Sequence, residues 1–538
     1  MTTRTDTLPL PMPEELGITG FPAYYPYQDT AIQYVTEQVE RIRLSGDPGV
    51  CALELPTGGG KSLVPAVLQA LTGLRVVVLA PTKSLQSQYM RQFQVSLNMH
   101  DIRGRNSYQC AVDTSVTVDD GPCVWGQQCS LMKPEVGGCS YYDAYYDSVD
   151  ASLVTTNPSY WMTQSEYGRG LGKVDVLVCD EADALFDTLG SFLAVPLYRH
   201  HVRRLLGIDL PDPEDKERLT AWCILAASRA ESLSDASSGG KTREAIRRTK
   251  ELRELANGLK RVLRLGISEW VHEPHPRNNE GFTLHPIWPA DFIEEYLYRG
   301  VPAVVLMSAT LPEDEVVDLV QMTPRTFTYR SYPSRVPIES RKVVHIKTVA
   351  MTHARQDVVA WVNRFDQIIT PRMDRRILFH TTSYERRNRV LMGSRFADDR
   401  ILLSHGSEDL EQAYQEFKLH PVPAVLVSPS LTRGYDFPYD ACRTNIIGKI
   451  PWPDSRNPVV KARTDRFSDY PSKTAMKTII QELGRGVRNV DDWCENFVID
   501  DSWRWFSKKY RHFMTKSFEE TVQWRSVDVI PAPRPLDS

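Results

Sequence analysis

Short apolar runs alternate along the chain with segments of helical periodicity. Eight runs rich in valine, isoleucine and leucine have the length of a buried strand, namely residues 50–55, 75–80, 174–179, 303–308, 376–381, 424–428, 445–450 and 497–500. Strands this apolar are typical of parallel sheets that helices cover on both faces. The pattern therefore predicts an α/β protein built on parallel sheets.

Two stretches interrupt this alternation. Residues 101–140 are rich in glycine, cysteine and polar residues, whereas residues 200–270 show helical patterns. Residues 241–264 contain nine basic and three acidic side chains, which suits either contact with phosphate or a solvated helix face. We expect a small subdomain in the first stretch and a helical insertion in the second. The Pro-rich ends, residues 1–20 and 526–538, are expected to lack fixed structure.

Composition excludes several classes of protein. The 538 residues suffice for several domains, and 41% hydrophobic with 25% charged residues is ordinary for a soluble globular chain. A formal net charge of −4 excludes binding of nucleic acid over the whole surface, so such contact needs a local basic groove. No apolar run reaches membrane-spanning length, and the amino terminus lacks a signal-peptide pattern. We therefore expect a cytoplasmic protein without a membrane partner.

The strongest single motif is LELPTGGGKS at residues 53–62, between a strand-like run and a helix-compatible segment. Glycines let backbone N–H groups surround phosphates, a lysine reaches the β and γ phosphates, and a serine hydroxyl ligates Mg²⁺. Leu55 stands where the strict pattern has glycine. The motif predicts a nucleotide site formed by Thr57, Gly58, Gly59, Gly60, Lys61 and Ser62.

Further motifs suit phosphoryl transfer. Asp180 and Glu181 follow a strand in VLVCDEAD, where one carboxylate can hold Mg²⁺ and the other can orient and deprotonate the attacking water. In QELGRGVR, residues 481–488, Arg485 and Arg488 are three positions apart. We expect them on one helix face, where they stabilise charge on the γ-phosphate from across a cleft. Two more motifs are SAT at 308–310 and SLTRGYDF at 430–437.

In this order the motifs resemble those of the superfamily-2 helicases, and more narrowly the iron-sulfur DNA helicases of the XPD and DinG group. The resemblance covers about residues 21–510. It implies two RecA-like parallel-sheet domains, residues 21–335 and 336–525, with both insertions in the first. These domains would close on ATP and Mg²⁺. The resemblance also implies roles in sensing the γ-phosphate for Gln481, in nucleotide binding for Gln28 and Asp436, and in coupling for Ser308 and Thr310.

Two features favour that group over the DEAD-box RNA helicases, whose signature DEAD stands at 180–183. The path from Asp183 to Ser308 is 125 residues long, which resembles the helical arch of the iron-sulfur group. Gln481 begins the last motif, where the RNA enzymes usually carry histidine. Two positions depart from the group's pattern: Asp183 replaces a common histidine, and Tyr25 stands where many relatives keep a basic residue.

Four of the nine cysteines fall within one short stretch. Cys110, Cys123, Cys129 and Cys139 have the spacing C-x12-C-x5-C-x9-C, without the close CxxC pair usual in zinc knuckles. Thiolates are ligands for iron-sulfur clusters or zinc. By resemblance these four would bind a [4Fe-4S] cluster, with structural zinc or unliganded thiols as the alternatives. Either metal would hold together a segment with few apolar residues.

The path of a single strand is predicted from residues that follow strands of the expected sheets, where ligands of RecA-like sheets bind. By resemblance they are Thr82, Lys83, Gln86, Thr381, Thr382, Ser383, Thr432 and Arg433. We expect an ATP-dependent DNA helicase or translocase of 5′ to 3′ direction, acting on single-stranded and forked DNA in repair, replication or recombination. A monomer is favoured, and repair or replication proteins are candidate partners. The alternatives are an RNA helicase and a nucleotide-regulated DNA-binding protein without unwinding activity.

Overall fold

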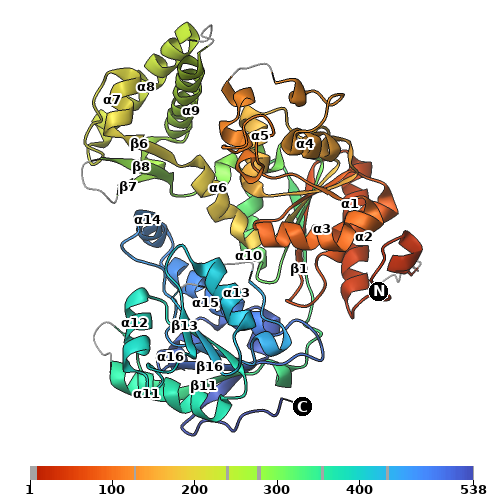
Figure 1. Ribbon diagram of the computed structural model, residues 1–538, viewed down its shortest axis with the longest axis vertical. Helices are drawn as coiled ribbons and strands as arrows, with labels where there is room; N and C mark the ends of the chain where they lie inside the picture. Colours follow the sequence, from red (N-terminus) through yellow and green to blue (C-terminus); the bar gives the residue numbers. More distant parts are fainter. Residues whose placement is uncertain are drawn as a thin grey trace.

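The computed structural model describes residues 9–125, 129–237, 242–275, 280–352, 357–429, 431 and 435–536, without the side chains of 125 and 165–167. Each of the two main domains contains a seven-stranded sheet, and every pairing in both sheets is parallel. The predicted α/β class with two parallel-sheet domains is therefore confirmed. Figure 1 shows the first domain above the second, with a third body beside the first.

The first sheet has the order β10-β1-β9-β5-β2-β4-β3. Its strands are β1 (Gly49–Glu54), β2 (Val76–Leu79), β3 (His100–Asp101), β4 (Leu153–Thr156), β5 (Val176–Asp180), β9 (Ala303–Ser308) and β10 (Thr326–Ser331). The central strands are buried throughout because helices cover both faces. These helices are α1 (Gln28–Ser45), α2 (Leu63–Thr72), α3 (Lys83–Leu97), α4 (Ser140–Asp150), α5 (Pro158–Tyr167), α6 (Leu185–Leu193) and α10 (Glu313–Val320).

The helical insertion is larger than the sequence predicts. Helices α7 (Arg199–Leu206), α8 (Lys216–Ser237) and α9 (Arg243–Leu265) are present, and α8 packs along α9. They pack beside an antiparallel sheet of three strands in the order β6-β8-β7. Its strands are β6 (Val195–Tyr198), β7 (Trp270–Pro274) and β8 (Gly281–Pro286). This sheet lies outside the predicted range 200–270. Its strands are half buried, so they lack the long apolar runs that mark the main sheets.

The second sheet has the order β13-β14-β12-β15-β16-β11-β17. Its strands are β11 (Val343–Val349), β12 (Arg376–His380), β13 (Leu402–Ser404), β14 (Ala424–Ser428), β15 (Thr444–Ile447), β16 (Glu495–Asp500) and β17 (Val522–Val527). The helices are α11 (Val358–Ile369), α12 (Tyr384–Gly393), α13 (Leu410–Leu419), α14 (Pro458–Arg466), α15 (Tyr470–Leu483), α16 (Trp503–Lys509) and α17 (Lys516–Glu519). Strands β10 and β11 are joined by residues 332–342, which connect the two domains.

Unstructured segments are expected at 1–20 and 526–538, but the described parts of these ends, residues 9–20 and 526–536, make ordered contacts; the remaining end residues lie outside the described ranges. Ile18 is fully buried in the core beside α1 and α2. The tail packs on the second domain, where Arg372 donates a hydrogen bond to the Pro531 carbonyl and the Arg534 N–H donates to Glu495. Proline lowers the chain entropy lost on docking, so a Pro-rich end can be ordered by a few contacts.

Two groups of contacts join the domains away from the sheets. Lys477 of α15 donates hydrogen bonds to Glu315 of α10 at 2.8 Å and to the Asp183 carbonyl at 2.9 Å. Helix α14 reaches from the second domain to the antiparallel sheet of the insertion (Figure 1). There Arg463, 5% exposed, donates to Asp187 at 2.8 Å and to the Ile287 carbonyl at 2.9 Å. The second domain is thus held to both the first domain and its insertion.

Candidate active site

A cleft of about 680 Å³ lies between the two domains. The first domain contributes the ends of β1, β5 and β9, which are neighbours in the sheet and point their carboxyl ends the same way. The second domain contributes the segment after α15. Of the predicted site residues, the cleft is lined by Gln28, Thr57, Gly58, Gly60, Lys61, Ser62, Thr82, Asp180, Glu181, Thr310, Asp436, Gln481, Arg485 and Arg488.

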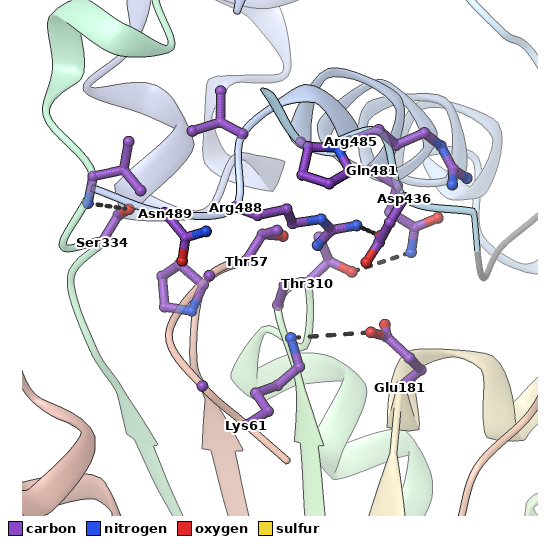
Figure 2. Close-up of a pocket in the computed structure, with 18 of the residues that line it drawn as sticks. Thr57, Lys61, Glu181, Thr310, Ser334, Asp436, Gln481, Arg485, Arg488 and Asn489 are labelled. Carbon is purple, nitrogen blue, oxygen red and sulfur yellow. Dashed lines mark hydrogen bonds and ion pairs between the residues drawn. The ribbon is translucent and has the colours of Figure 1, made fainter. Parts of the chain in front are cut away.

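The phosphate loop is a tight turn between β1 and α2. The Gly59 N–H donates to the Pro56 carbonyl, and Gly58 and Gly60 have positive φ angles of 78° and 77°. A side chain at Gly58 would approach the Arg488 carbonyl oxygen to 2.3 Å. Glycine is therefore required both for the backbone conformation and for the close approach of the second domain. Lys61 lies at the end of this turn, 3.9 Å from Glu181 (Figure 2).

Gln28 is held against the loop at the start of α1. Its side-chain amide donates to the Gly60 carbonyl at 2.8 Å, and its oxygen accepts from the Tyr25 N–H at 2.8 Å. These bonds fix a 2%-exposed side chain at the rim of the cleft. This position suits the predicted role in nucleotide binding.

The acidic pair lies at the carboxyl end of β5. Asp180 accepts a hydrogen bond from Tyr89 at 2.8 Å, and burial, reinforced by neighbouring Glu181, raises the pKa of Asp180 to about 6. A divalent cation bound here would favour the ionised carboxylate, so the donor set fits Mg²⁺ held by Asp180 and Ser62. Glu181 has a φ of +49°, a left-handed conformation that costs a non-glycine residue energy and is typical of functional positions.

Asp183 connects the motifs of both domains. Its carboxylate accepts hydrogen bonds from Ser308 at 2.7 Å, Thr310 at 3.3 Å and Gln481 at 2.6 Å. Gln481 also donates to Thr310 at 3.2 Å. The predicted coupling residues and the predicted γ-phosphate sensor are therefore in one hydrogen-bond network, and the aspartate that departs from the iron-sulfur group's pattern is its centre.

The two arginines do not share a helix face, so that expectation is wrong. Helix α15 ends at Leu483, and Gly484 and Gly486 flank Arg485 in a 3₁₀ turn, which turns the two side chains apart. Arg488 projects into the cleft and pairs with Asp436, whereas Arg485 points away from Lys61 (Figure 2). The Arg485 guanidinium donates to the Tyr435 and Leu431 carbonyls at 2.9 and 3.2 Å.

Arg488 keeps its charge in this position. Burial lowers the pKa of its guanidinium to about 10, and Glu181 opposes the shift. The group therefore stays protonated at neutral pH and presents a partly desolvated positive charge to the cleft. Such a charge suits the predicted stabilisation of the γ-phosphate from the second domain.

Sequence reasoning missed Arg335, in the segment that connects the domains. Its Nε donates to the Gly58 carbonyl at 2.7 Å and its Nη2 to Asn489 at 3.1 Å. Its guanidinium lies 3.5 Å from the Tyr25 ring centroid. A basic group is thus present beside Tyr25, supplied by residue 335. The sequence YPSRVP carries no motif that would have indicated this contact.

The cysteine-rich segment folds into short 3₁₀ turns beside α4. Within the described residues, no group of three or more histidine, cysteine, aspartate or glutamate side chains has the arrangement of a metal site. Burial raises the pKa of the Cys123 thiol, and Cys129 and Cys139 lie near enough to raise it further. Cys110 accepts a hydrogen bond from the Asp113 N–H at 3.4 Å. Cys129 and Cys139 are therefore within electrostatic range of Cys123, without forming a closed set of ligands in the described residues.

The residues predicted to contact a single strand have several different surroundings. Lys83 is exposed, Thr82 caps α3, and Ser383 caps α12. Gln86 and Thr381 are fully buried, Gln86 near the Ile102 carbonyl and Thr381 on Ser428, so neither is free to contact a ligand. Gln86 lies in the first turn of α3 and Thr381 directly follows β12, and both side chains face the protein interior.

Thr382 has a φ of +63°, an outlier for a β-branched residue. Such strain at a strand end is typical of a functional loop. Thr432 and Arg433 lie outside the described residues.

Comparisons with known proteins add two family matches. The DEAD/DEAH box helicase family matches residues 25–221, and the helicase C-terminal domain matches residues 368–521. The chain belongs to the superfamily-2 helicases. As such it is an ATP-dependent helicase, a class of enzyme that works with nucleotide and Mg²⁺. A search of curated proteins found no match.

Solved structures of XPD share the fold. A structure named XPD helicase aligns with a TM-score of 0.61 and 17% identity over 91% of this chain and 98% of its own. The structure of Xpd4 from S. tokodaii aligns with a TM-score of 0.56 and 13% identity over 93% of this chain and 99% of its own.

Among the described residues, every helix is too short or too polar to span a membrane.

Proposed function

We propose that this helicase translocates on single-stranded DNA from 5′ to 3′ and separates duplex DNA in repair, replication or recombination. The observation that carries the proposal is the cleft in which Lys61 and Glu181 of one domain face Arg488 of the other. A nucleotide bound by residues of both domains would couple its hydrolysis to the distance between the domains. The XPD-like fold and the long insertion favour DNA as the substrate.

Within the cleft each side chain has one task in the proposed cycle. Lys61 holds the β and γ phosphates, Glu181 orients the attacking water and accepts its proton, and Arg488 stabilises the charge of the transferring group. Mg²⁺ would supply further charge neutralisation. After hydrolysis the γ-phosphate leaves Arg488 and Gln481, and Gln481 would pass that change through Asp183 to Ser308 and Thr310.

We further propose that Cys110, Cys123, Cys129 and Cys139 hold a [4Fe-4S] cluster, with zinc as the alternative. The thiol chemistry, the electrostatic influence of Cys129 and Cys139 on Cys123 and a backbone N–H donated to Cys110 support this assignment. A cluster would fix a segment of turns that has little regular structure of its own. We also propose that the protein acts on forked DNA and that proteins of repair or replication are its partners.

Strand displacement on matched substrates tests the nucleic-acid assignment. DNA and RNA duplexes of the same sequence, each with either a 5′ or a 3′ single-stranded tail, are offered with ATP. We expect separation of the DNA duplex with the 5′ tail, and loss of this separation in Lys61→Ala. Preferential separation of RNA would favour an RNA helicase, and ATP-dependent release without separation would favour a regulatory DNA-binding protein.

Iron and zinc content with visible absorption tests the cluster. Anaerobically purified wild-type protein should contain about four iron atoms per chain and absorb near 400 nm. Cys123→Ser should lose both, whereas Cys223→Ser, a buried cysteine of α8, should keep them. A colourless protein with bound zinc would identify the alternative metal.

A further inference from the structure

Two exposed tryptophans form a pair on the surface of the second domain. Trp452 lies in the loop after β15 and Trp505 on α16, after β16. They are 37% and 49% exposed, and their rings are nearly parallel, with centroids 6.4 Å apart and an angle of 20°. Fully buried Phe506 lies edge-on to both, at 5.1 and 6.1 Å. The pair thus presents flat aromatic faces above an apolar floor.

The local sequence holds this pair in position. Pro451 and Pro453 flank Trp452, and prolines on both sides restrict the backbone around the indole. The backbone N–H of Trp452 donates to the Ile450 carbonyl at 2.9 Å, and the backbone N–H of Ile450 donates to the Asp500 carboxylate of β16 at 3.1 Å. The backbone that carries the Trp452 indole is therefore restricted before a ligand stacks on it.

The surroundings of the pair match single-stranded nucleic acid. Strands β12, β15 and β16 are parallel neighbours, so the loop with Thr382 and Ser383 leaves the sheet at the same edge as the two tryptophans. The segment 502–510, SWRWFSKKY, has three basic residues and no acidic one. Arg504, Lys508 and Lys509 are exposed beside Trp505. Aromatic faces with adjacent cations are the combination that binds bases and phosphates of a single strand.

We propose that Trp452 and Trp505 form a stacking platform for a base of the single strand on which this helicase moves, an inference that rests on the proposed function above. A base in van der Waals contact with both rings at once needs about 7 Å between them, so a base stacks on an outer indole face or enters after a small widening. Stacking is indifferent to base identity because every base has a flat face. The platform would therefore hold any sequence during translocation.

Fluorescence anisotropy with two labelled oligonucleotides tests the platform. One is an oligothymidylate of about twelve nucleotides and the other an abasic phosphodiester of equal length and charge. We expect wild-type protein to bind the oligothymidylate about tenfold or more tightly than the abasic strand. Trp452→Leu and Trp505→Leu should lower this preference severalfold and leave abasic binding unchanged. Trp524→Leu, an exposed tryptophan of β17, is the control and should keep the preference.

Intrinsic tryptophan fluorescence of the unmodified protein gives a second measurement. Oligothymidylate should quench it and the abasic strand should not. A preference that persists in both variants, or equal quenching by both strands, would reject the platform and leave the surface for a protein partner. Wild-type protein that binds neither strand would reject the platform together with the proposed function. Base preference without any strand separation would support the platform and reject only the unwinding activity.

Discussion

Arg485 and Arg488 are three positions apart, yet their guanidinium groups lie in different surroundings. Arg488 faces the cleft and pairs with the half-exposed carboxylate of Asp436, a partner that a phosphate can replace. Arg485 is buried and satisfies carbonyls of the preceding loop. We therefore expect Arg488 to contact the nucleotide, whereas Arg485 stabilises the loop that presents Asp436.

Arg488→Ala separates these roles. We expect ATP turnover to fall about 10³-fold, the usual effect of removing such an arginine, with nucleotide affinity changed only severalfold. Arg485→Ala should mainly lower the melting temperature, because two buried carbonyls lose their donors. Steady-state turnover, binding of a fluorescent ATP analogue and thermal unfolding measure all three quantities. Equal loss of turnover in both variants at unchanged melting temperature would contradict this assignment.

Glu54, at the end of β1, is a buried acid outside the reaction. Burial raises its pKa to about 7, although Tyr329 donates a hydrogen bond to it at 2.7 Å. The folded chain therefore keeps a proton that the unfolded chain loses above pH 4.5, so this residue destabilises the fold as pH rises from 4.5 to 7. The cost is at most about 3 kcal/mol above that window.

Glu54→Gln removes this titration and keeps an acceptor for Tyr329. Its melting temperature should exceed that of wild type at about pH 8, and the difference should vanish at about pH 4, below the pKa of both states. Glu14→Gln, an exposed acid, is the control and should match wild type at both values. A constant difference between Glu54→Gln and wild type across the pH range would show that Glu54 does not titrate in this window.

At the scale of elements, α14 joins the second domain to the insertion of the first. Arg463 lies among Phe186, Trp288 and Tyr470 at 5.5 Å from each ring centroid, and Arg466 pairs with Glu269 at 2.7 Å. Asp187, the partner of Arg463, lies on α6, and α6 begins two residues after Asp183 of the nucleotide site. We therefore expect α14 to couple movement between the domains to the insertion.

Arg463→Met keeps the apolar stem and removes the charge. We expect hydrolysis within about threefold of wild type and strand separation reduced about tenfold, since one buried charged hydrogen-bond set of about 2 kcal/mol is lost between the domains. Arg456→Met is the matched control, because Arg456 is exposed in the preceding loop and pairs with Asp454. Parallel loss of hydrolysis and separation would contradict a coupling role for α14.

The sequence predicted elements whose signal is local. The apolar runs of β1, β5 and β9 and the glycines of the phosphate loop specify strand, turn and helix within ten residues of themselves. It missed the antiparallel sheet, whose β8 alternates between partly exposed and buried positions, and it missed Arg335 and Arg463. The partners of Arg335 and Arg463 lie up to 277 residues away, a separation that no local pattern encodes.

At the scale of the whole molecule, the structure holds the two domains close together. The Gly58 backbone lies against the Arg488 backbone, Arg335 bridges Gly58 to Asn489, and Lys477 binds Glu315. The nucleotide cleft therefore belongs to neither domain alone. A helicase cycle requires such a shared site, because hydrolysis moves the domains only if both sides hold the same phosphates.

A structure with ADP, tetrafluoroaluminate and Mg²⁺ tests this shared site most directly, since the fluoride complex imitates the transferring phosphoryl group. The account predicts Lys61 and Arg488 within hydrogen-bonding distance of that group at the same time, with Arg488 released from Asp436. A complex in which the group contacts Lys61 while Arg488 remains on Asp436 would contradict it.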